Sequence, residues 1–135
     1  MSADEARAPV MPLILLVEDE FLIREMVAEA LQAAGFATLV ATGGEEAIKF
    51  FEEHCEEIRG LVTDINLNDG LDGWELACTA RERASDLPVV YVSGASGHEW
   101  TSRGVPNSLL IAKPFAAAQV VVAISSLLVA SDTMP

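Results

Sequence analysis

The stretch LILLVEDEF, residues 13–21, joins an apolar run directly to a group of acids. Its first five residues are apolar, and Glu18, Asp19 and Glu20 follow them without a break. A short continuous apolar run is typical of a strand that is buried on both faces of a parallel sheet. Because neighbouring carboxylates repel one another, acids at the end of such a strand indicate a site that a positive group completes.

Four more short apolar runs follow along the chain, with longer segments of helical spacing between them. These runs are ATLVA at 37–41, GLVTD at 60–64, PVVYVS at 88–93 and SLLIA at 108–112. Five strands that alternate with five helices predict an α/β fold, in which a parallel sheet is covered by helices on both faces.

The helical segments carry recognisable ends. On the first, residues 20–34, the predicted core face consists of Ile23, Met26, Val27, Ala30 and Leu31. Gly35 follows it, as a C-terminal glycine does. Thr42 and Glu45 predict a capping box at the start of the second helix, and Asp72 predicts the N-cap of the third.

The last two helical segments are unusual. Residues 96–103 are flanked by glycine and show weak helical spacing, so we expect a short helix there. Residues 115–130 carry no charge, but 16 residues are too few for a membrane span, which needs roughly 20. We therefore expect a buried or partner-facing helix, on which Val122 and Val129 lie outside the core face.

The formal net charge of −13 limits the possible partners. A protein that binds nucleic acid brings Lys and Arg to the phosphates, and an anionic membrane surface repels acids. We therefore expect no nucleic acid and no membrane among the partners. Basic proteins and divalent cations fit the charge better.

The length of 135 residues suits one domain, which we place at residues 12–130. We expect residues 1–11 to form a disordered tail and residues 131–135 a short C-terminal tail. The first residues contain acids and no apolar signal-peptide segment, and the two cysteines form no recognisable motif. The expected location is the reducing cytoplasm.

Chemically active side chains stand at the ends of four of the five predicted strands. Glu18 and Asp19 follow the first strand, Asp64 ends the third, Ser93 ends the fourth and Lys113 follows the fifth. In a parallel α/β sheet these carboxyl ends meet at one edge, where ligands bind. We therefore expect the five side chains to form one site.

The chemistry of this group of residues fits a phosphoryl site. Clustered carboxylates are ligands for Mg²⁺, which is also bound by phosphate oxygens and water. Lys113 can neutralise further negative charge, and Ser93 can donate a hydrogen bond to an oxyanion. Asp64 is the expected nucleophile, because a carboxylate can take up a phosphoryl group as an acyl phosphate.

The motifs VEDE, VTDINL, VVYVSG and IAKPF occupy these strand ends in order. Together, over residues 12–130, they resemble the receiver domain of bacterial two-component response regulators. The resemblance implies a flavodoxin-like (βα)5 fold, a doubly wound five-stranded parallel sheet in a single domain. It also implies Mg²⁺ as cofactor, and as partner a sensor histidine kinase or a histidine phosphotransfer protein.

The resemblance further implies a metal set made of Glu18, Asp19, Asp64 and Asn66. Asp64 would accept the phosphoryl group, Asp19 would bind Mg²⁺ directly and Glu18 through water. Asn66 would supply its backbone carbonyl and lie near the phosphoryl group. This chain also departs from the family at Asn68, which stands where the family commonly has a proline.

Three more residues match the family at the other strand ends. Ser93 would move toward the phosphoryl group, Lys113 would pair with it, and Gly94 would leave room for its oxygens. The lysine–proline peptide is often cis in the family. The family's aromatic switch is absent, because Leu110 stands in its place and Tyr91 is expected to belong to the core.

The expected function is that of a stand-alone, non-enzymatic response regulator, because the chain ends at Pro135. It would signal to an unknown downstream protein, and could form a homodimer through its fourth helix, fifth strand and fifth helix. One alternative is a receiver-like binding module that does not depend on phosphorylation. Another is a Mg²⁺-dependent phosphatase with an aspartyl intermediate, although the sequence lacks a second acid at Asn66.

Overall fold

The computed structural model describes residues 11–67, 70–94 and 97–133. Its strands are β1 (Leu13–Val17), β2 (Ala37–Ala41), β3 (Ile58–Asp64), β4 (Val89–Ser93) and β5 (Ser108–Ala112). Its helices are α2 (Phe21–Ala33), α3 (Gly44–His54), α4 (Gly73–Arg83), the 3-10 helix η1 (Gly97–Glu99), α5 (Trp100–Arg103) and α6 (Ala117–Thr133).

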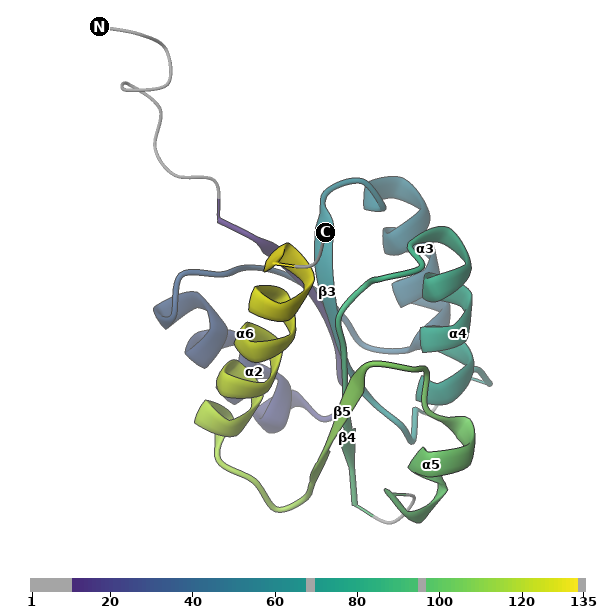
Figure 1. The fold of residues 1–135 in the computed structure, drawn as a ribbon. Coiled ribbons are helices and arrows are strands. Elements are labelled where there is room, and N and C mark those ends of the chain that lie inside the picture. Colours follow the sequence, from purple (N-terminus) through teal and green to yellow (C-terminus); the bar gives the residue numbers. More distant parts are fainter. Residues whose placement is uncertain (1–10, 68–69, 95–96, 134–135) are drawn as a thin grey trace, which may run out of the picture.

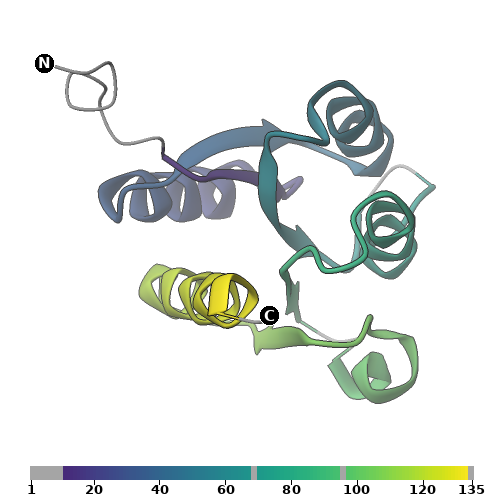
Figure 2. The same cartoon turned by 45° about the horizontal axis from the view of Figure 1, so that its top comes forward.

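The five strands form one parallel sheet in the order β2-β1-β3-β4-β5. Helices α2 and α6 cover one face of this sheet, and α3, α4 and α5 cover the other (Figure 1). Seen after the turn in Figure 2, the sheet separates these two layers of helices. The predicted doubly wound α/β fold is therefore confirmed.

The strands are apolar along their whole length because each of their faces packs against a helical layer. Leu15 and Val17 of β1 lie in the core under α3 and α4, whereas Ile14 and Leu16 lie in the core under α2 and α6. All four side chains are buried. Alternate side chains of a strand point to opposite faces, so a strand between two layers needs apolar residues at every position.

The ends of the helices confirm two predictions and correct one. Gly35 has the left-handed φ of +100° that favours glycine after a helix. The Asp72 side chain accepts a hydrogen bond from the backbone N–H of Glu75, which completes a capping box at α4. The predicted Thr42–Glu45 box is wrong, because α3 begins at Gly44 and the carboxylate of Glu46 accepts from the Thr42 backbone N–H.

Three boundaries or faces differ from the prediction. Met26 is 39% exposed, because the buried face of α2 passes through Val27, Ala28 and Leu31 instead. Strand β3 begins at Ile58, two residues before the predicted start, and the final helix continues to Thr133, beyond its expected end at residue 130. The predicted disordered tail falls mostly on residues 1–10, outside the described residues.

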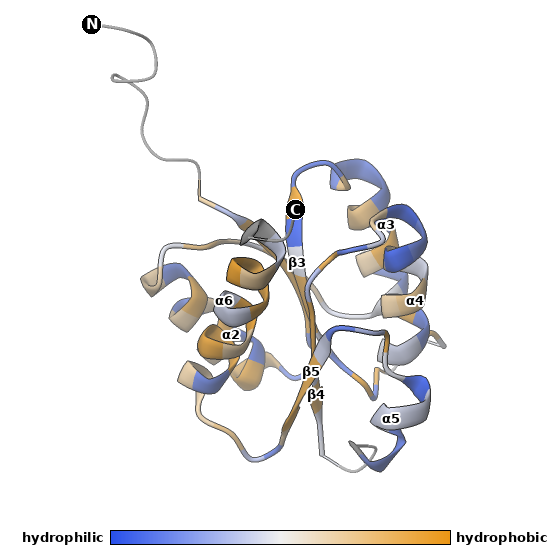
Figure 3. Cartoon of the chain, viewed as in Figure 1, coloured by the Kyte–Doolittle hydropathy of each residue, from blue (hydrophilic) through white to orange (hydrophobic). Residues whose placement is uncertain are grey.

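The last helices match their weak or unusual sequence signals. Helix α5 spans four residues and buries none of them, as expected for a segment with poor helical spacing. Helix α6 is strongly hydrophobic (Figure 3), and its Val122 and Val129 are each 64% exposed. Within the described part of the chain, no helix combines the length and the apolar character that a membrane crossing requires.

Candidate functional site

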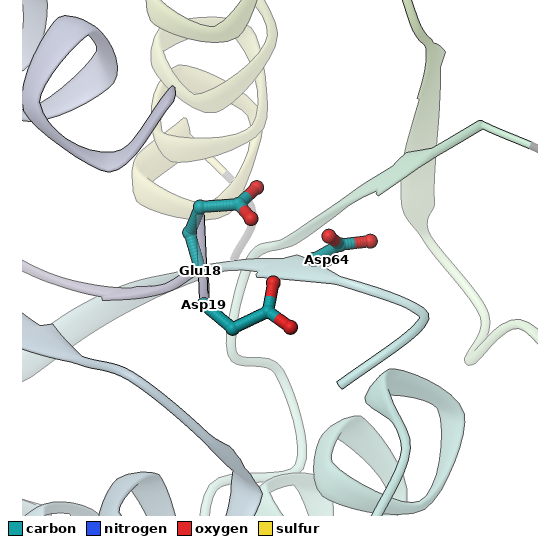
Figure 4. A group of neighbouring side chains, drawn as sticks. All are labelled: Glu18, Asp19 and Asp64. Carbon is teal, nitrogen blue, oxygen red and sulfur yellow. The ribbon is translucent and has the colours of Figure 1, made fainter. Parts of the chain in front are cut away.

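Three carboxylates meet at the carboxyl edge of the sheet. Strands β1 and β3 are neighbours, so Glu18 and Asp19, which follow β1, lie beside Asp64 at the end of β3. One oxygen from each carboxylate lies within 4.8 Å of the others, and the three side chains face the same space (Figure 4). The structure therefore brings together acids that are 45 residues apart in sequence.

Lys113 reaches this group of acids from the end of β5. Its Nζ lies 3.0 Å from Asp64 Oδ2 and 3.6 Å from Glu18 Oε1. Its backbone N–H donates to the carbonyl oxygen of Ser93 at 2.8 Å, which ties the lysine to the end of β4. The peptide bond between Lys113 and Pro114 is cis, as the family resemblance implied.

Burial sets the electrostatics of these groups. Glu18 and Asp64 are 3% and 5% exposed. Burial raises the pKa of Glu18 to about 7, and the negative charge of Asp64 adds to this effect. The hydrogen bond from the Glu20 N–H and the charge of Lys113 act in the opposite direction and lower this pKa. Burial alone would lower the pKa of Lys113, but the hydrogen bond and charge of Asp64 outweigh it and raise that pKa. The site thus keeps a full positive charge beside carboxylates that repel one another.

The other predicted site residues surround Asp64. The backbone N–H of Asn66 donates to Asp64 Oδ1 at 3.2 Å, so both carboxylate oxygens of Asp64 have partners. Ser93 is buried at the end of β4, the strand that pairs with β3. Gly94 is exposed, and a Cβ there would meet Lys113 Cδ at 3.9 Å and no nearer atom of the described residues. The metal-binding role of the Asn66 carbonyl stays a prediction.

Two residues near the acids were missed by the sequence reasoning. Arg24 Nη1 donates to the carbonyl oxygens of Glu18, at 3.1 Å, and Asp19, at 3.4 Å. A Cβ at Gly73 would lie only 2.4 Å from the carbonyl oxygen of Asp64. The available signals were an arginine one helical turn after the acids and a glycine directly after an N-cap aspartate.

The environment of Tyr91 agrees with its predicted place in the core. Tyr91 is fully buried, its ring centroid lies 4.7 Å from that of Trp74, and its hydroxyl accepts a hydrogen bond from the Val105 N–H at 3.1 Å. Leu110 pairs with Tyr91 across β4 and β5. The other departure from the family, Asn68, lies outside the described residues.

The donor set fits a divalent magnesium ion. Mg²⁺ prefers hard oxygen ligands and is usually held by one or two carboxylates together with water and phosphate oxygens. Glu18, Asp19 and Asp64 offer carboxylate oxygens close enough to share one ion. A dication would also offset the repulsion by Asp64, which adds to the effect of burial on the pKa of Glu18.

Comparison with known proteins gives the same family over most of the chain. The family model described as the response regulator receiver domain matches residues 14–125. A crystal structure of a response regulator receiver protein from Sinorhizobium medicae WSM419 is 39% identical, with a TM-score of 0.85, and the match covers 89% of this chain and 96% of that one. The receiver domain of the hybrid histidine kinase CckA is 31% identical, with a TM-score of 0.72 over 86% of this chain and 98% of that domain.

Curated relatives include longer signalling proteins. The sensor kinase CckA of Brucella abortus (strain 2308) is 30% identical over 122 residues, which are 88% of this chain and 13% of that protein. The transcriptional regulatory protein SphR of Synechococcus elongatus, named for alkaline phosphatase synthesis, is 31% identical over 90% of this chain. The chain spans 13% of the length of the first of these relatives and 51% of the second.

Proposed function

Because this chain belongs to the response regulator receiver domain family, we propose that it accepts a phosphoryl group on Asp64 in the presence of Mg²⁺. Receiver domains receive phosphoryl groups from histidine kinases and generally bind Mg²⁺ at an acidic pocket. The observation that carries the proposal is the ion pair between Lys113 and Asp64, at 3.0 Å, beside the acidic pair Glu18 and Asp19.

The donor is a phosphohistidine of a sensor histidine kinase or of a histidine phosphotransfer protein. An oxygen of Asp64 forms a bond to phosphorus while the bond from phosphorus to the imidazole nitrogen breaks. The nitrogen keeps the electron pair and takes up a proton. When bound, Mg²⁺ would neutralise charge on the transferring group. The transfer occurs once per chain in the cytoplasm, without turnover of an external substrate, so the protein is not an enzyme in this proposal.

Other residues of the chain orient Asp64 and make room for the phosphoryl group. Lys113 already holds one oxygen of Asp64 and can follow the new negative charge when the phosphoryl group arrives. Ser93 stands on the neighbouring strand end, and Gly94 leaves open space beside Lys113. Asn66 orients the second Asp64 oxygen through its backbone N–H.

Mass spectrometry after incubation with acetyl phosphate and Mg²⁺ tests the proposal. The wild-type chain should gain one phosphoryl group, and Asp64→Ala should gain none. Asp86→Ala removes an exposed acid away from the sheet edge and should be labelled like the wild type. Absence of label in the wild type, or full labelling of Asp64→Ala, would contradict the proposal.

A receiver-like module whose binding does not depend on phosphorylation is the second candidate. It is favoured by Leu110, which replaces the aromatic residue that usually reports phosphorylation in this family. This candidate predicts that the downstream protein, once captured, binds the labelled and unlabelled chains equally well. A dissociation constant that changes on labelling would decide for the phosphorylation-dependent function.

A homodimer through α5, β5 and α6 is the proposed form of signalling. Helix α6 exposes Val122 and Val129 and carries no charged residue between positions 117 and 131, whereas two chains of net charge −13 would repel elsewhere. Light scattering with and without an acyl-phosphate mimic tests this. A strict monomer under both conditions would exclude it.

A further inference from the structure

We infer that Arg24 is a positioning residue for the acidic pair, which it holds through the backbone of the loop between β1 and α2. This role rests on the proposed function, because the pair has a task only if the site takes up Mg²⁺. Arg24 contacts none of the three carboxylates in the hydrogen bonds that the structure gives for the described residues. Its effect on them would act through the peptide groups that carry them.

The geometry places one guanidinium nitrogen between two successive carbonyl groups. Arg24 Nη1 lies 3.1 Å from the carbonyl oxygen of Glu18 and 3.4 Å from that of Asp19. A carbonyl that accepts a hydrogen bond fixes the plane of its peptide, and two adjacent fixed planes leave the residue between them little freedom. That residue is Asp19, the predicted direct ligand.

The arginine is itself held in place. Its backbone N–H donates to the carbonyl of Glu20 at 2.9 Å, in the first turn of α2. Its guanidinium carbon lies 5.4 Å from the centroid of the Phe21 ring, at cation–π distance. A side chain fixed at both ends loses little entropy when it binds the loop, so it can act as a rigid support.

The rest of the loop is held differently. The Glu18 N–H donates to the Ala41 carbonyl at 3.1 Å, and the Glu20 N–H donates to Glu18 Oε2 at 3.0 Å. These two bonds fix the start of the loop and one carboxylate oxygen of Glu18. Within the described residues, Arg24 is the side chain that donates to both loop carbonyls.

The direction in which Mg²⁺ affinity changes when Arg24 is removed distinguishes a positioning role from an effect of its charge alone. Arg24 is positive, so its charge repels a dication, and its removal would strengthen Mg²⁺ binding if charge alone mattered. If Arg24 positions the ligands, its removal weakens Mg²⁺ binding. Loss of a group that orients metal ligands typically costs about 10- to 100-fold in metal affinity.

Isothermal titration of the full chain with MgCl₂, without any phosphoryl donor, measures this directly. Arg24→Met should raise the dissociation constant for Mg²⁺ about tenfold. Arg24→Gln should raise it similarly, and decides the question if the methionine variant does not fold by circular dichroism. Arg83→Met is the matched control, because it removes one positive charge from an exposed pair with Glu52 at the far end of α4.

The outcomes separate the two levels of inference. If the wild type binds Mg²⁺ and both Arg24 variants bind it as tightly as Arg83→Met, or more tightly, the positioning role is refuted and the proposed function stands. If the wild type takes up no Mg²⁺, the proposed function fails and the role of Arg24 fails with it. Weaker binding in the Arg24 variants alone supports both.

Discussion

Replacing Gly73 by alanine should disturb the phosphoryl site from the back of Asp64. Gly73 is the first residue of α4, and its N–H donates to the Ile65 carbonyl at 2.8 Å. A Cβ at this position would lie 2.4 Å from the Asp64 carbonyl oxygen and 2.8 Å from Ile65 Cα. Both neighbours are backbone atoms of the strand end, so neither can rotate away, and α4 or the strand end must move.

The magnitude follows from two opposing effects. Gly→Ala at a compatible position stabilises a protein by about 0.4–1 kcal/mol, because it restricts the unfolded chain. Overpacking of a tight site costs about 1–3 kcal/mol. Since the Gly73 contacts are far shorter than van der Waals distance, the cost should dominate, and we expect a net loss of about 1–2 kcal/mol in the free energy of unfolding.

Urea unfolding, followed by the fluorescence of Trp74 and Trp100, measures this loss. Gly94→Ala is the control on stability, because a Cβ there meets its nearest neighbour, Lys113 Cδ, at an ordinary 3.9 Å. Its free energy of unfolding should stay within about 0.5 kcal/mol of the wild type. Phosphorylation of Asp64 by acetyl phosphate should also slow in Gly73→Ala. Equal stability of Gly73→Ala and Gly94→Ala would refute the close-contact argument.

Three further outcomes are expected. Lys113→Met should still be labelled by acetyl phosphate, but its conformational response, measured by amide hydrogen exchange, should weaken; a full response would rule out the proposed role of the lysine. In EDTA, the Glu18 carboxyl should make the stability depend on pH. Its pKa rises from 4.5 to about 7 on folding, so it binds more protons in the folded state. Its stabilising contribution is therefore present below pH 4.5 and falls by about 3 kcal/mol as the pH rises through 7. Glu18→Gln should remove this slope from urea unfolding curves, and an unchanged slope would contradict the assignment. Tyr91→Phe leaves the buried Val105 N–H without its partner and should cost about 1–3 kcal/mol of stability, with Asp64 labelled as in the wild type; no loss in the unfolding curve would show that this bond is not needed.

Much of the site could be predicted because its residues occupy strand ends. The runs at 13–17, 37–41 and 108–112 coincide with β1, β2 and β5. Once strands alternate with helices, a parallel sheet follows, and its carboxyl ends meet at one edge. The sequence therefore predicts that Asp64 and Lys113 lie close together, although they are 49 residues apart.

The buried face of α2 and the first residue of α3 depended on how these helices pack against the sheet. The spacing of apolar residues in α2 allowed Met26 in the core, but packing against β1 and α6 turned Ala28 inward and left Met26 partly exposed. At α3 the same rules predicted a role for Glu45, whereas the helix begins one residue later and Glu46 makes the contact. One-residue differences of this kind are below the precision of a periodic pattern.

The sequence by itself determined the strands, their parallel arrangement and the types of side chain at the carboxyl edge of the sheet. Each of these rests on local composition and on rules that hold for every parallel sheet. Only the tertiary structure decided which backbone atoms those side chains meet. Arg24 reaches the carbonyls of Glu18 and Asp19, and Gly73 allows α4 to approach Asp64. Contacts of this kind depend on the position of a helix relative to a strand end to within about an ångström, and close packing of the whole domain sets that position.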